Sequence, residues 1–355
     1  MTESISLRQW NRTLLTRQHL TQRVDEDAIE VIDRCVGLQS QDPQAAFFGL
    51  ASRIEDFDPA ELDGLLENRD VVRIALQRGT VFLMDALDAR WMRASLTPMM
   101  ISGARHHARR LVGVSVPEVA AAGAEIVGGA QAPVTAAELR AALAERWPGE
   151  PAEAMAAVVR ASTPLVQTPP RGLWRRSGGP AFVLLDEWIG AGEPAVTGDD
   201  AVRELIRLYL RGFGPSTVAA VQTWSGLRGL RPVMEAMEAD WELYRLLGPG
   251  GEKLYDLEGL RPADGSAAVP VRLVAPFDNV LFTAADRVRI ADPEVYARTV
   301  TPNGQSPGFV LVDGRLAGTW KIVDRRVELT ELVDLQPRER RECEIEARRL
   351  DGLGL

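Results

Sequence analysis

The tetrapeptide Gln39-Ser40-Gln41-Asp42 is the short stretch with the clearest capacity for chemistry. Outside a helix, residues two apart point to the same side of the chain, so the two glutamine amides can converge on one point. The alternative is a pair of polar residues in a turn between helices. Asp42 can support the glutamines by hydrogen bonds, but an Asp before a proline is also a common turn residue.

Motifs of the common hydrolases and metalloenzymes are absent from the sequence. It contains no P-loop, no HExxH, no GxSxG and no GxGxxG after an expected strand. The three histidines are His19 and the adjacent pair His106 and His107, and the pair fits a solvated basic helix end better than a catalytic site. Cys35 and Cys343 lie far apart without a CxxC partner, so neither a disulfide framework nor a zinc site is indicated. If the chain is an enzyme, its reaction needs little acid–base strength.

The distribution of charge points to a basic face in spite of a formal net charge of −9. Residues 73–110 contain seven arginines and two acidic residues, and residues 160–176 contain four arginines and no acid. Residues 203–231 and 315–326 are also locally basic. A basic face suits a nucleic-acid partner, because clustered arginines bind phosphates. The alternative is ordinary solvated charge scattered over the surface.

Length and composition are those of a globular protein of two to four compact units. Of the 355 residues, 46% are hydrophobic and 26% are charged, which excludes a disordered chain. No run of about 18 uncharged apolar residues predicts a membrane span, and the N-terminus lacks the pattern of a secretion signal. We therefore expect a cytoplasmic protein.

The elements that must position these residues follow a repeating pattern of helices closed by a hairpin. The first group predicts helices at 5–20, 25–38, 43–53 and 58–68 and a hairpin at 71–84. The same order recurs in helices at 133–148, 151–165, 197–214, 215–227 and 231–237 and in strands within 166–188, 241–248 and 252–259. Three helices and a hairpin are the order of a winged helix, a variant of the helix-turn-helix class.

The last part of the chain has a different character. The segments 269–282, 308–323 and 325–333 predict strands of a small β-sheet or barrel, with a tight turn at Asp313-Gly314. A helix at 337–350, with charges of alternating sign, closes the chain. We therefore predict an α+β fold of three tandem winged-helix modules and a C-terminal β-rich domain. The predicted divisions are 1–115, including a further helix after the hairpin, 116–196, 197–266 and 267–355.

The chain resembles the bacterial winged-helix family of the AlkZ and YcaQ DNA glycosylases. The resemblance lies in stretches that run in order across nearly the whole chain. They are LRQWNRTLLTRQHL (7–20), GLQSQDPQAAFFGLASR (37–53), RGTVFLMDALD (78–88), PPRGLWRRSG (169–178), YLRGFGPSTVAAVQTWSGL (209–227), LVAPFDNVLF (273–282) and LVDGRLAGTWKI (311–322).

The resemblance implies three tandem winged helices in a C-shaped molecule around a DNA channel. It also implies a reactive Gln-x-Gln motif, which corresponds by position to Gln39 and Gln41 and places the chain in the AlkZ-like branch. The implied activity is that of a monofunctional DNA glycosylase, acting on N7-alkylguanine-type lesions, bulky natural-product adducts or interstrand crosslinks, in repair or self-resistance. The implied partner is double-stranded DNA carrying alkylated purines, bound by a monomer without metal or cofactor. One departure is Phe82, where many relatives have histidine, which leaves the substrate range or rate open.

Recognition of DNA would rest on arginine contacts to phosphates. The candidates are Arg78, Arg105, Arg109, Arg110, Arg171, Arg175, Arg176, Arg287 and Arg325. The turn 324–326, or the loop 283–289 with Arg287 and Arg289, can form a hairpin that probes a groove. Trp174 and Trp320 can stack on bases, although core packing suits both better.

Two other function classes remain open at this point. A non-catalytic winged-helix regulator would bind a palindromic site without releasing a base. A protein-interaction scaffold would use winged helices without nucleic acid, and the net acidity of the chain fits it. Base release separates the glycosylase from both alternatives, and salt-dependent DNA binding separates the regulator from the scaffold.

Overall fold

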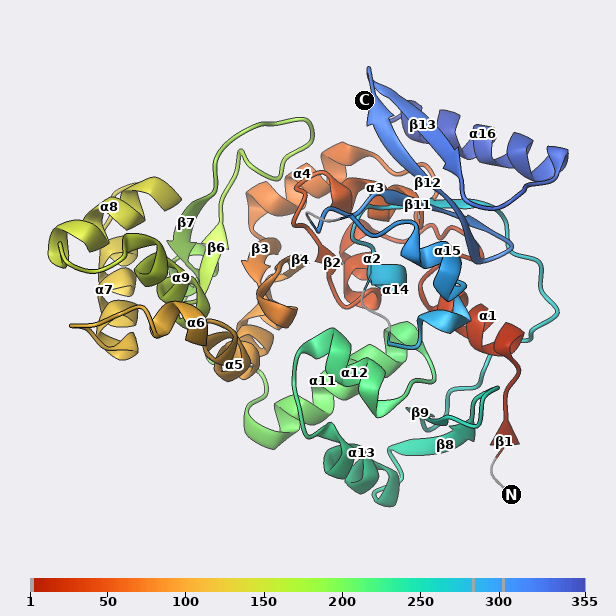
Figure 1. The fold of residues 1–355 in the computed structure, drawn as a ribbon, viewed down its shortest axis with the longest axis horizontal. Coiled ribbons are helices and arrows are strands. Elements are labelled where there is room, and N and C mark those ends of the chain that lie inside the picture. Colours follow the sequence, from red (N-terminus) through yellow and green to blue (C-terminus); the bar gives the residue numbers. More distant parts are fainter. Residues whose placement is uncertain (1–2, 283–284, 302–303, 355) are drawn as a thin grey trace. The chain divides into compact units, whose positions relative to one another are not determined.

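The computed structural model describes residues 3–354 except 283–284 and 302–303, and the described residues form a mixed α+β fold with three small sheets (Figure 1). The chain divides into two compact units. The first comprises Met1–Leu62 together with Arg203–Leu355, and the second comprises Asp63–Val202. The division into four domains that the sequence suggested stays a prediction. Among the described helices, none is both long and apolar enough to cross a membrane.

The first unit opens with two short helices that lead to the glutamine motif. Helix α1 (Leu7–Arg17) begins with a capping box between Ser6 and Gln9, the first of which accepts from the backbone N–H of the second. Helix α2 (Ala28–Arg34) ends earlier than the predicted 25–38, because Val36 and Gly37 adopt left-handed backbone angles. The Gly37 N–H donates to the Ile32 carbonyl across this turn, as in a Schellman cap.

The chain emerges from that turn in extended conformation and soon becomes helical again. Strand β2 (Leu38–Gln39) holds the first glutamine, and helix α3 (Ala45–Ala51) starts shortly after Pro43. Between them, the Asp42 carboxylate accepts a hydrogen bond from the Gln44 N–H at 2.9 Å. This is the turn role that the sequence favoured for Asp42, and the motif lies outside a helix as predicted.

The third helical group lies in the first unit except for the start of α11, which spans the boundary between the units, and its elements confirm the sequence prediction. Its helices are α11 (Gly198–Phe213), α12 (Val218–Ser225) and α13 (Leu230–Ala239), and its strands are β8 (Leu243–Leu247) and β9 (Lys253–Leu257). The two strands pair antiparallel, and β1 (Glu3–Ser4) adds a parallel strand beside β8. Gly212 allows α11 to approach the end of α2, because a Cβ there would lie 2.6 Å from the Arg34 carbonyl oxygen.

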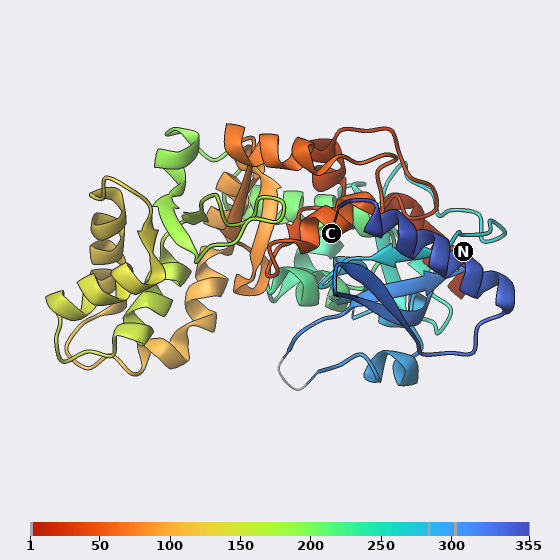
Figure 2. The ribbon, with the colours of Figure 1, turned by 90° about the horizontal axis from the view of Figure 1, so that it is seen from above.

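The C-terminal part is an antiparallel sheet covered by the last helix. Its strands lie in the order β10 (Arg272–Val274), β11 (Gly308–Val312), β12 (Arg315–Val323) and β13 (Arg326–Glu331). Helix α16 (Pro337–Asp351) packs along this sheet, and α16 and the strands β11 to β13 are blue in Figure 2. Asp313 and Gly314 both have positive φ, as the predicted tight turn between β11 and β12 requires.

One prediction in this part is wrong. The strand expected over 269–282 covers 272–274 alone, and Asn279–Phe282 form the short helix α14. The extended chain is broken at Phe277, whose φ is +61°, and the Asp278 carboxylate then accepts from the Val280 N–H at 3.1 Å. The 3-10 turn η2 (Arg287–Arg289) and helix α15 (Pro293–Ala297) follow before β11.

The sheet of the second unit contains the predicted hairpin at 71–84 and the strands predicted within 166–188. Its strands lie in the order β4 (Val81–Asp85), β3 (Val71–Ala75), β6 (Leu165–Gln167), β7 (Ala181–Leu184) and β5 (Val134–Thr135). The β3–β4 turn contains the 3-10 turn η1 (Gln77–Gly79), where Arg78 and Gly79 have φ of +56° and +74°. Both central residues are therefore left-handed, which explains why the turn falls at Arg78-Gly79.

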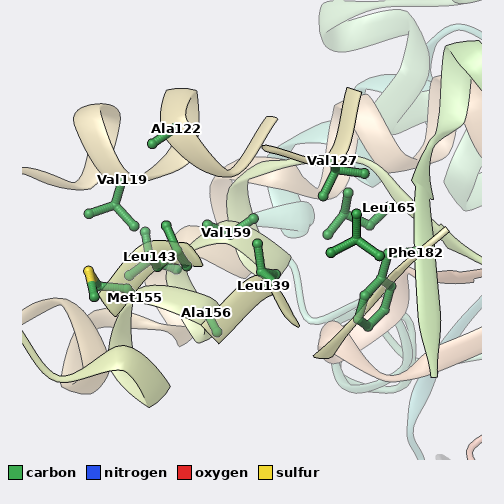
Figure 3. Close-up of a cluster of buried hydrophobic side chains, with 12 residues drawn as sticks. Val119, Ala122, Val127, Leu139, Leu143, Met155, Ala156, Val159, Leu165 and Phe182 are labelled. Carbon is green, nitrogen blue, oxygen red and sulfur yellow. The ribbon is translucent and has the colours of Figure 1, made fainter. Parts of the chain in front are cut away.

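Helices surround a separate apolar core in the second unit. They are α4 (Pro59–Asn68), which spans the boundary between the units, α5 (Ala86–Gly103), α6 (Arg105–Ala108), α7 (Val116–Gly128), α8 (Ala136–Arg146), α9 (Ala152–Ser162) and α10 (Leu185–Ile189). Figure 3 shows Val119, Leu143 and Val159 within this core. At Gly123, an added Cβ would lie 2.3 Å from a Val159 methyl group, so α7 and α9 can pack closely there.

Candidate functional site

Gln39 lies in the wall of a small pocket inside the first unit. Gln39 of strand β2 lines the pocket together with Gln18, which follows α1, and Arg53, which follows α3. Asp278, just before α14, and Asn279, its first residue, complete the polar residues of the lining. The cavity volume is about 10 Å³. A cavity of that size holds roughly one water molecule. The pocket therefore matches, in size, a site that holds a single water, and both polar and apolar residues line it.

A buried ion pair forms one side of the pocket. Arg53 Nη1 donates to Asp278 Oδ2 at 2.9 Å, and Arg53 Nη2 donates to Asp278 Oδ1 at 3.1 Å. Burial alone lowers the pKa of Arg53, but the Asp278 carboxylate outweighs burial and raises the pKa above its ordinary value. Arg53 therefore stays charged, and the bidentate pair fixes the segment before α14 against the end of α3.

Two further residues of the pocket are held by the surrounding structure. Gln18 donates from Nε2 to the Gly212 carbonyl at 2.7 Å, and its Oε1 accepts from Arg53 at 3.3 Å. Burial raises the pKa of the Cys35 thiol to about 11. A thiol with such a pKa carries little thiolate near neutral pH, so Cys35 is a poor nucleophile.

The two glutamines of the motif differ in exposure. The side chain of Gln39 is buried, with 5% of the residue exposed, whereas Gln41 is exposed. Val36 has a φ of +56°, although it is β-branched, and it stands three residues before Gln39. Backbone strain of this kind clusters at functional sites. Convergence of the two amides on one reacting point stays a prediction.

The candidate DNA-binding arginines of the hairpin and of α6 lie in the second unit. Arg78 is half-buried at the β3–β4 turn, and burial lowers its pKa to about 10. A cation that burial disfavours gains from contact with an anion such as a phosphate. Arg105, Arg109 and Arg110 are exposed in and directly after α6. Among the residues with described placement, no carboxylate lies within ion-pair distance of these three.

The predicted basic turn at 171–176 is mixed in character. Arg171 is half-buried, and its Nη1 donates to the Gly178 carbonyl at 2.8 Å, so it shapes the loop between β6 and β7. Arg175 and Arg176 are exposed, and Arg175 has a φ of +55°. Trp174 is half-buried, and its backbone N–H donates to the Asp63 carboxylate at 2.7 Å.

The candidates of the C-terminal part lie in the first unit. Arg325 is exposed at the β12–β13 turn, where Asp324 and Arg325 both have positive φ and Val323 pairs with Arg326. The two-residue turn is therefore a tight hairpin tip, as the groove-probing hypothesis requires. Arg287 is partly buried: its Nε donates to the Leu281 carbonyl at 2.8 Å, and its guanidinium lies 3.9 Å from the Tyr296 ring centre.

Other sequence candidates are structural. Residues 283–284 of the proposed loop 283–289 lie outside the described residues, and Arg289 is buried with Nη1 on the Phe213 carbonyl at 2.8 Å. Trp320 is buried and donates to the Val274 carbonyl at 2.8 Å, which confirms core packing. Phe82 is fully buried in β4.

Asp278 and Asn279 line the pocket but were not among the candidates that the sequence motifs indicated. They follow directly on the apolar run Leu273–Phe277, which was read as part of one strand. Two adjacent polar residues interrupting a buried apolar run are the signal that identifies them. Asn279 is 6% exposed and Asp278 is 6% exposed, so both are almost as buried as the strand residues before them.

Comparisons with known proteins agree on the family. The family model "DNA glycosylase AlkZ-like" matches residues 32–352. The structure of the DNA glycosylase AlkZ of Streptomyces sahachiroi matches with a TM-score of 0.80 and 22% identity, covering 99% of this chain and 98% of that one, so the two share a fold. A curated protein of the same organism, an interstrand DNA cross-link repair glycosylase, is 27% identical over 171 residues. That match spans 44% of this chain and 43% of the relative. The chain belongs to the AlkZ-like DNA glycosylase family.

Proposed function

We propose that this protein is a monofunctional DNA glycosylase that hydrolyses the N-glycosidic bond of N7-alkylated guanine. The family match supplies the reaction class. The observation that supports the mechanism is the place of Gln39, a buried residue in the lining of a pocket of about 10 Å³ that Arg53 and Asp278 also line. A pocket of that size accommodates the single water that hydrolysis consumes.

The chemistry suits a site without a strong acid. Alkylation at N7 places a positive charge on guanine, so the base leaves as a neutral group when the C1′–N9 bond breaks and N9 keeps the electron pair. The sugar becomes an oxocarbenium-like cation. The water oxygen then bonds to C1′, and one water proton passes to solvent. Amides are poor bases, so they suit a substrate that is already activated.

In this proposal the two glutamines orient water and stabilise positive charge. The amide oxygens of Gln39 and Gln41 accept hydrogen bonds from the attacking water, which fixes its approach to C1′. They also place partial negative charge near the cationic sugar. Gln39 acts from the pocket wall, and Gln41 acts from the exposed side, where the lesion arrives. Asp42 holds the turn through its bond to the Gln44 N–H.

Both lysines of the chain are engaged on other elements. Lys253 Nζ lies 5.2 Å from the Tyr255 ring centre and 3.9 Å from a Glu235 carboxylate oxygen, and Lys321 Nζ lies 3.4 Å from Glu328. A bifunctional glycosylase needs an amine nucleophile at the sugar carbon. Their engagement supports hydrolysis by water and so a monofunctional enzyme.

We further infer that the helical groups with their hairpins act as winged-helix modules on DNA. The exposed arginines of α6, of the β6–β7 loop and of the β12–β13 turn supply the cations for phosphate contacts. The related cross-link repair glycosylase suggests bulky adducts or interstrand crosslinks as substrates within this reaction class.

Base release from defined DNA tests the proposal. The purified protein is incubated under single-turnover conditions with a duplex that contains one 7-methylguanine, and free base and abasic strand are measured. Wild-type protein should release the base, and the Gln39→Ala/Gln41→Ala double variant should lose at least about 100-fold in rate. Binding to the same duplex should change little.

A matched control separates the motif from glutamine loss in general. Gln131→Ala removes an exposed amide in the second unit, between α7 and β5, and should keep the wild-type rate. Undiminished release by the double variant would remove the proposed mechanism. Absent release by wild-type protein that binds a palindromic site would instead identify a regulator.

A further inference from the structure

A groove of about 640 Å³ lies between α13 and the β8–β9 hairpin in the first unit. The helix and β8 are side by side in Figure 1. The aromatic and apolar part of the lining comes from Trp241, Leu243 and Tyr244. The charged residues of the lining are Glu235, Glu238, Arg245, Lys253 and Glu258. Binding sites for small molecules span about 300–1,000 Å³, so the groove can hold one or two side chains of a partner.

Trp241 is exposed, in contrast to the other tryptophans of the chain, and 82% of its surface is accessible to solvent. It stands two residues after the end of α13 and has a left-handed φ of +62°. A glycine is the usual residue at such a helix end, because most side chains disfavour left-handed backbone angles. The indole ring contacts little of the chain, so it adds little to the hydrophobic stabilisation of the fold. The ring is therefore available to a partner.

Other aromatic rings of these elements already have a cation over them. The Arg261 guanidinium lies 5.6 Å from the Tyr244 ring centre, and Lys253 Nζ lies 5.2 Å from the Tyr255 ring centre. Within the described part of the chain, no arginine or lysine lies over the ring of Trp241. An indole attracts ammonium and guanidinium groups more strongly than a phenol ring does. Trp241 thus offers its face to a cation from outside the chain.

The surface around the groove is acidic. Between residues 230 and 258, six acidic and three basic residues are exposed or half-buried. Arg203 of α11 neutralises part of this excess, because it pairs with Asp240 and Glu242. In three-helix modules of the helix-turn-helix class, the third helix enters the major groove of DNA. As the third helix of its group, α13 would bring its carboxylates close to phosphates, so the charge favours a cationic partner over DNA.

Glu258 is the carboxylate of the groove that lacks a counter-charge. The other two carboxylates of the lining pair with its two cations. No cation of the described residues lies within ion-pair distance of Glu258. The Glu258 N–H donates to the Glu242 carbonyl at 2.9 Å, so Glu258 lies beside the residue that follows Trp241. An indole face and an uncompensated carboxylate in one groove are the two groups that recognise a guanidinium or an ammonium ion.

We propose that the groove of α13 and the β8–β9 hairpin binds a cationic segment of a partner protein. An arginine or lysine of that segment stacks on Trp241 and pairs with Glu258. The remainder of the segment lies over Leu243 and Tyr244. This interaction goes beyond the proposed glycosylase function and does not depend on it, because the arginines assigned to DNA lie on other elements.

Peptide binding to the whole chain tests the proposal. The probe is a fluorescein-labelled peptide of six Arg-Gly repeats, and the matching peptide of Gln-Gly repeats lacks the charge. Fluorescence anisotropy should show binding of the arginine peptide and at least about 10-fold weaker binding of the glutamine peptide. Trp241→Ala should weaken binding of the arginine peptide by about 10-fold, and Trp241→Phe should restore part of the loss. Glu258→Gln should weaken it by about threefold.

Two matched variants in the second unit control for these changes. Leu87→Ala removes another large exposed apolar side chain, and Glu193→Gln removes another exposed carboxylate. Both should bind the arginine peptide as the wild-type protein does. Equal affinity of the wild type and Trp241→Ala overturns the proposal, because the acidic net charge of the chain then accounts for the binding. Absence of binding by the wild type overturns it as well.

Base release keeps this proposal apart from the proposed function. Trp241→Ala should release 7-methylguanine from the duplex at the wild-type rate and bind single-stranded oligothymidylate as the wild type does. A slower release or a weaker oligothymidylate complex in Trp241→Ala would place Trp241 at a nucleic-acid surface and overturn the proposal. Failure of the wild type to release the base would overturn the glycosylase function and leave peptide binding at Trp241 standing.

Discussion

Two buried arginines, one in each compact unit, have different hydrogen-bond partners. In the first unit, Arg53 meets the Asp278 carboxylate through two hydrogen bonds, and its pKa is raised. In the second unit, Arg93 is also fully buried, but its Nη2 donates to the backbone carbonyls of Ala161 and Thr163, at 2.9 and 3.0 Å. Burial lowers the pKa of Arg93 to about 10. The carbonyls accept hydrogen bonds from Nη2 without cancelling the charge of the guanidinium.

The same difference is visible on the surface. Arg340 of α16, in the first unit, bonds to the Glu331 carboxylate at 2.8 Å. Arg105, Arg109 and Arg110 of the second unit have no carboxylate at ion-pair distance among the described residues. Other arginines of the second unit, Arg90, Arg140 and Arg146, do pair with carboxylates, so the contrast concerns α6 and the two residues after it. Net charge, which is −9 for the chain, hides this contrast.

Removal of the buried Asp278 carboxylate from the first unit should cause the largest loss of stability. Asp278→Ala leaves Arg53 buried without its counter-charge, and we expect the free energy of unfolding to fall by about 3–5 kcal/mol. Chemical denaturation measures it. In contrast, Glu125→Ala breaks the exposed pair with Arg146 in the second unit and should cost less than about 1 kcal/mol. Equal losses of unfolding free energy in the two variants would contradict the interpretation that the Asp278 carboxylate stabilises the buried charge of Arg53.

Replacement of the exposed arginines of the second unit should affect DNA binding and leave stability intact. In the triple variant Arg105→Gln/Arg109→Gln/Arg110→Gln, up to three phosphate contacts are lost. The slope of log Kd against log salt concentration should therefore fall by about 3. Titrations of a fluorescent duplex at several salt concentrations measure the slope.

An equal change of charge on α16 provides the control for the arginine triple. Arg338, Arg341 and Arg348 are exposed on that helix, and their replacement by Gln removes the same three charges. If the two triple variants weaken binding alike, the effect is one of overall charge and the second unit has no special role.

Local sequence signals predicted the positions of most elements. The β3–β4 hairpin and the Asp313-Gly314 turn follow from alternating apolar residues and a glycine, both of which act within a few residues. Helix α7 has an alanine-rich sequence with weak helical periodicity, and it was not predicted from the chain alone. Gly123 within it is explained by the tertiary structure, because the Val159 side chain of α9 occupies the space that a larger residue would need.

The candidate site was predicted in part. The extended conformation at Gln39 follows from the end of α2 and from Pro43, both of which are local. The pairing of Arg53 with Asp278 joins residues 225 positions apart, and no local pattern encodes it. The strand reading of 269–282 failed for the same reason, because the chain turns at Phe277 where the ion pair forms.

The histidine pair beside the exposed arginines should make DNA binding sensitive to pH. His106 and His107 have ring centres 3.7 Å apart. Burial, then His106, Arg110 and Arg160, lower the pKa of His107, and Glu153 opposes the shift. His107 is therefore neutral at pH 7 and gains its charge only as the pH falls below the ordinary histidine range.

A charged His107 adds one cation to the patch, so DNA affinity should rise as the pH falls below the ordinary histidine pKa of about 6.5. The salt slope should grow by about 1 over the same change of pH. The His107→Gln variant should lose this increment, whereas His19→Gln, in the first unit, should keep it. If the DNA affinity of His107→Gln still depends on pH as in the wild type, another group causes that dependence and the prediction is wrong.

The smallest effect should come from the thiols, both of which lie in the first unit. Burial raises the pKa of Cys35 to about 11 and that of Cys343 to about 11. The thiolate is the reactive form, so at pH 8 about one thiol in 1,000 is ionised. The native protein should thus react negligibly with an aromatic disulfide reagent within minutes, whereas the denatured protein releases two equivalents. Fast labelling of Cys35 in the native protein would show that the pocket around Arg53 opens readily. Such opening would contradict a stable, buried ion pair between Arg53 and Asp278.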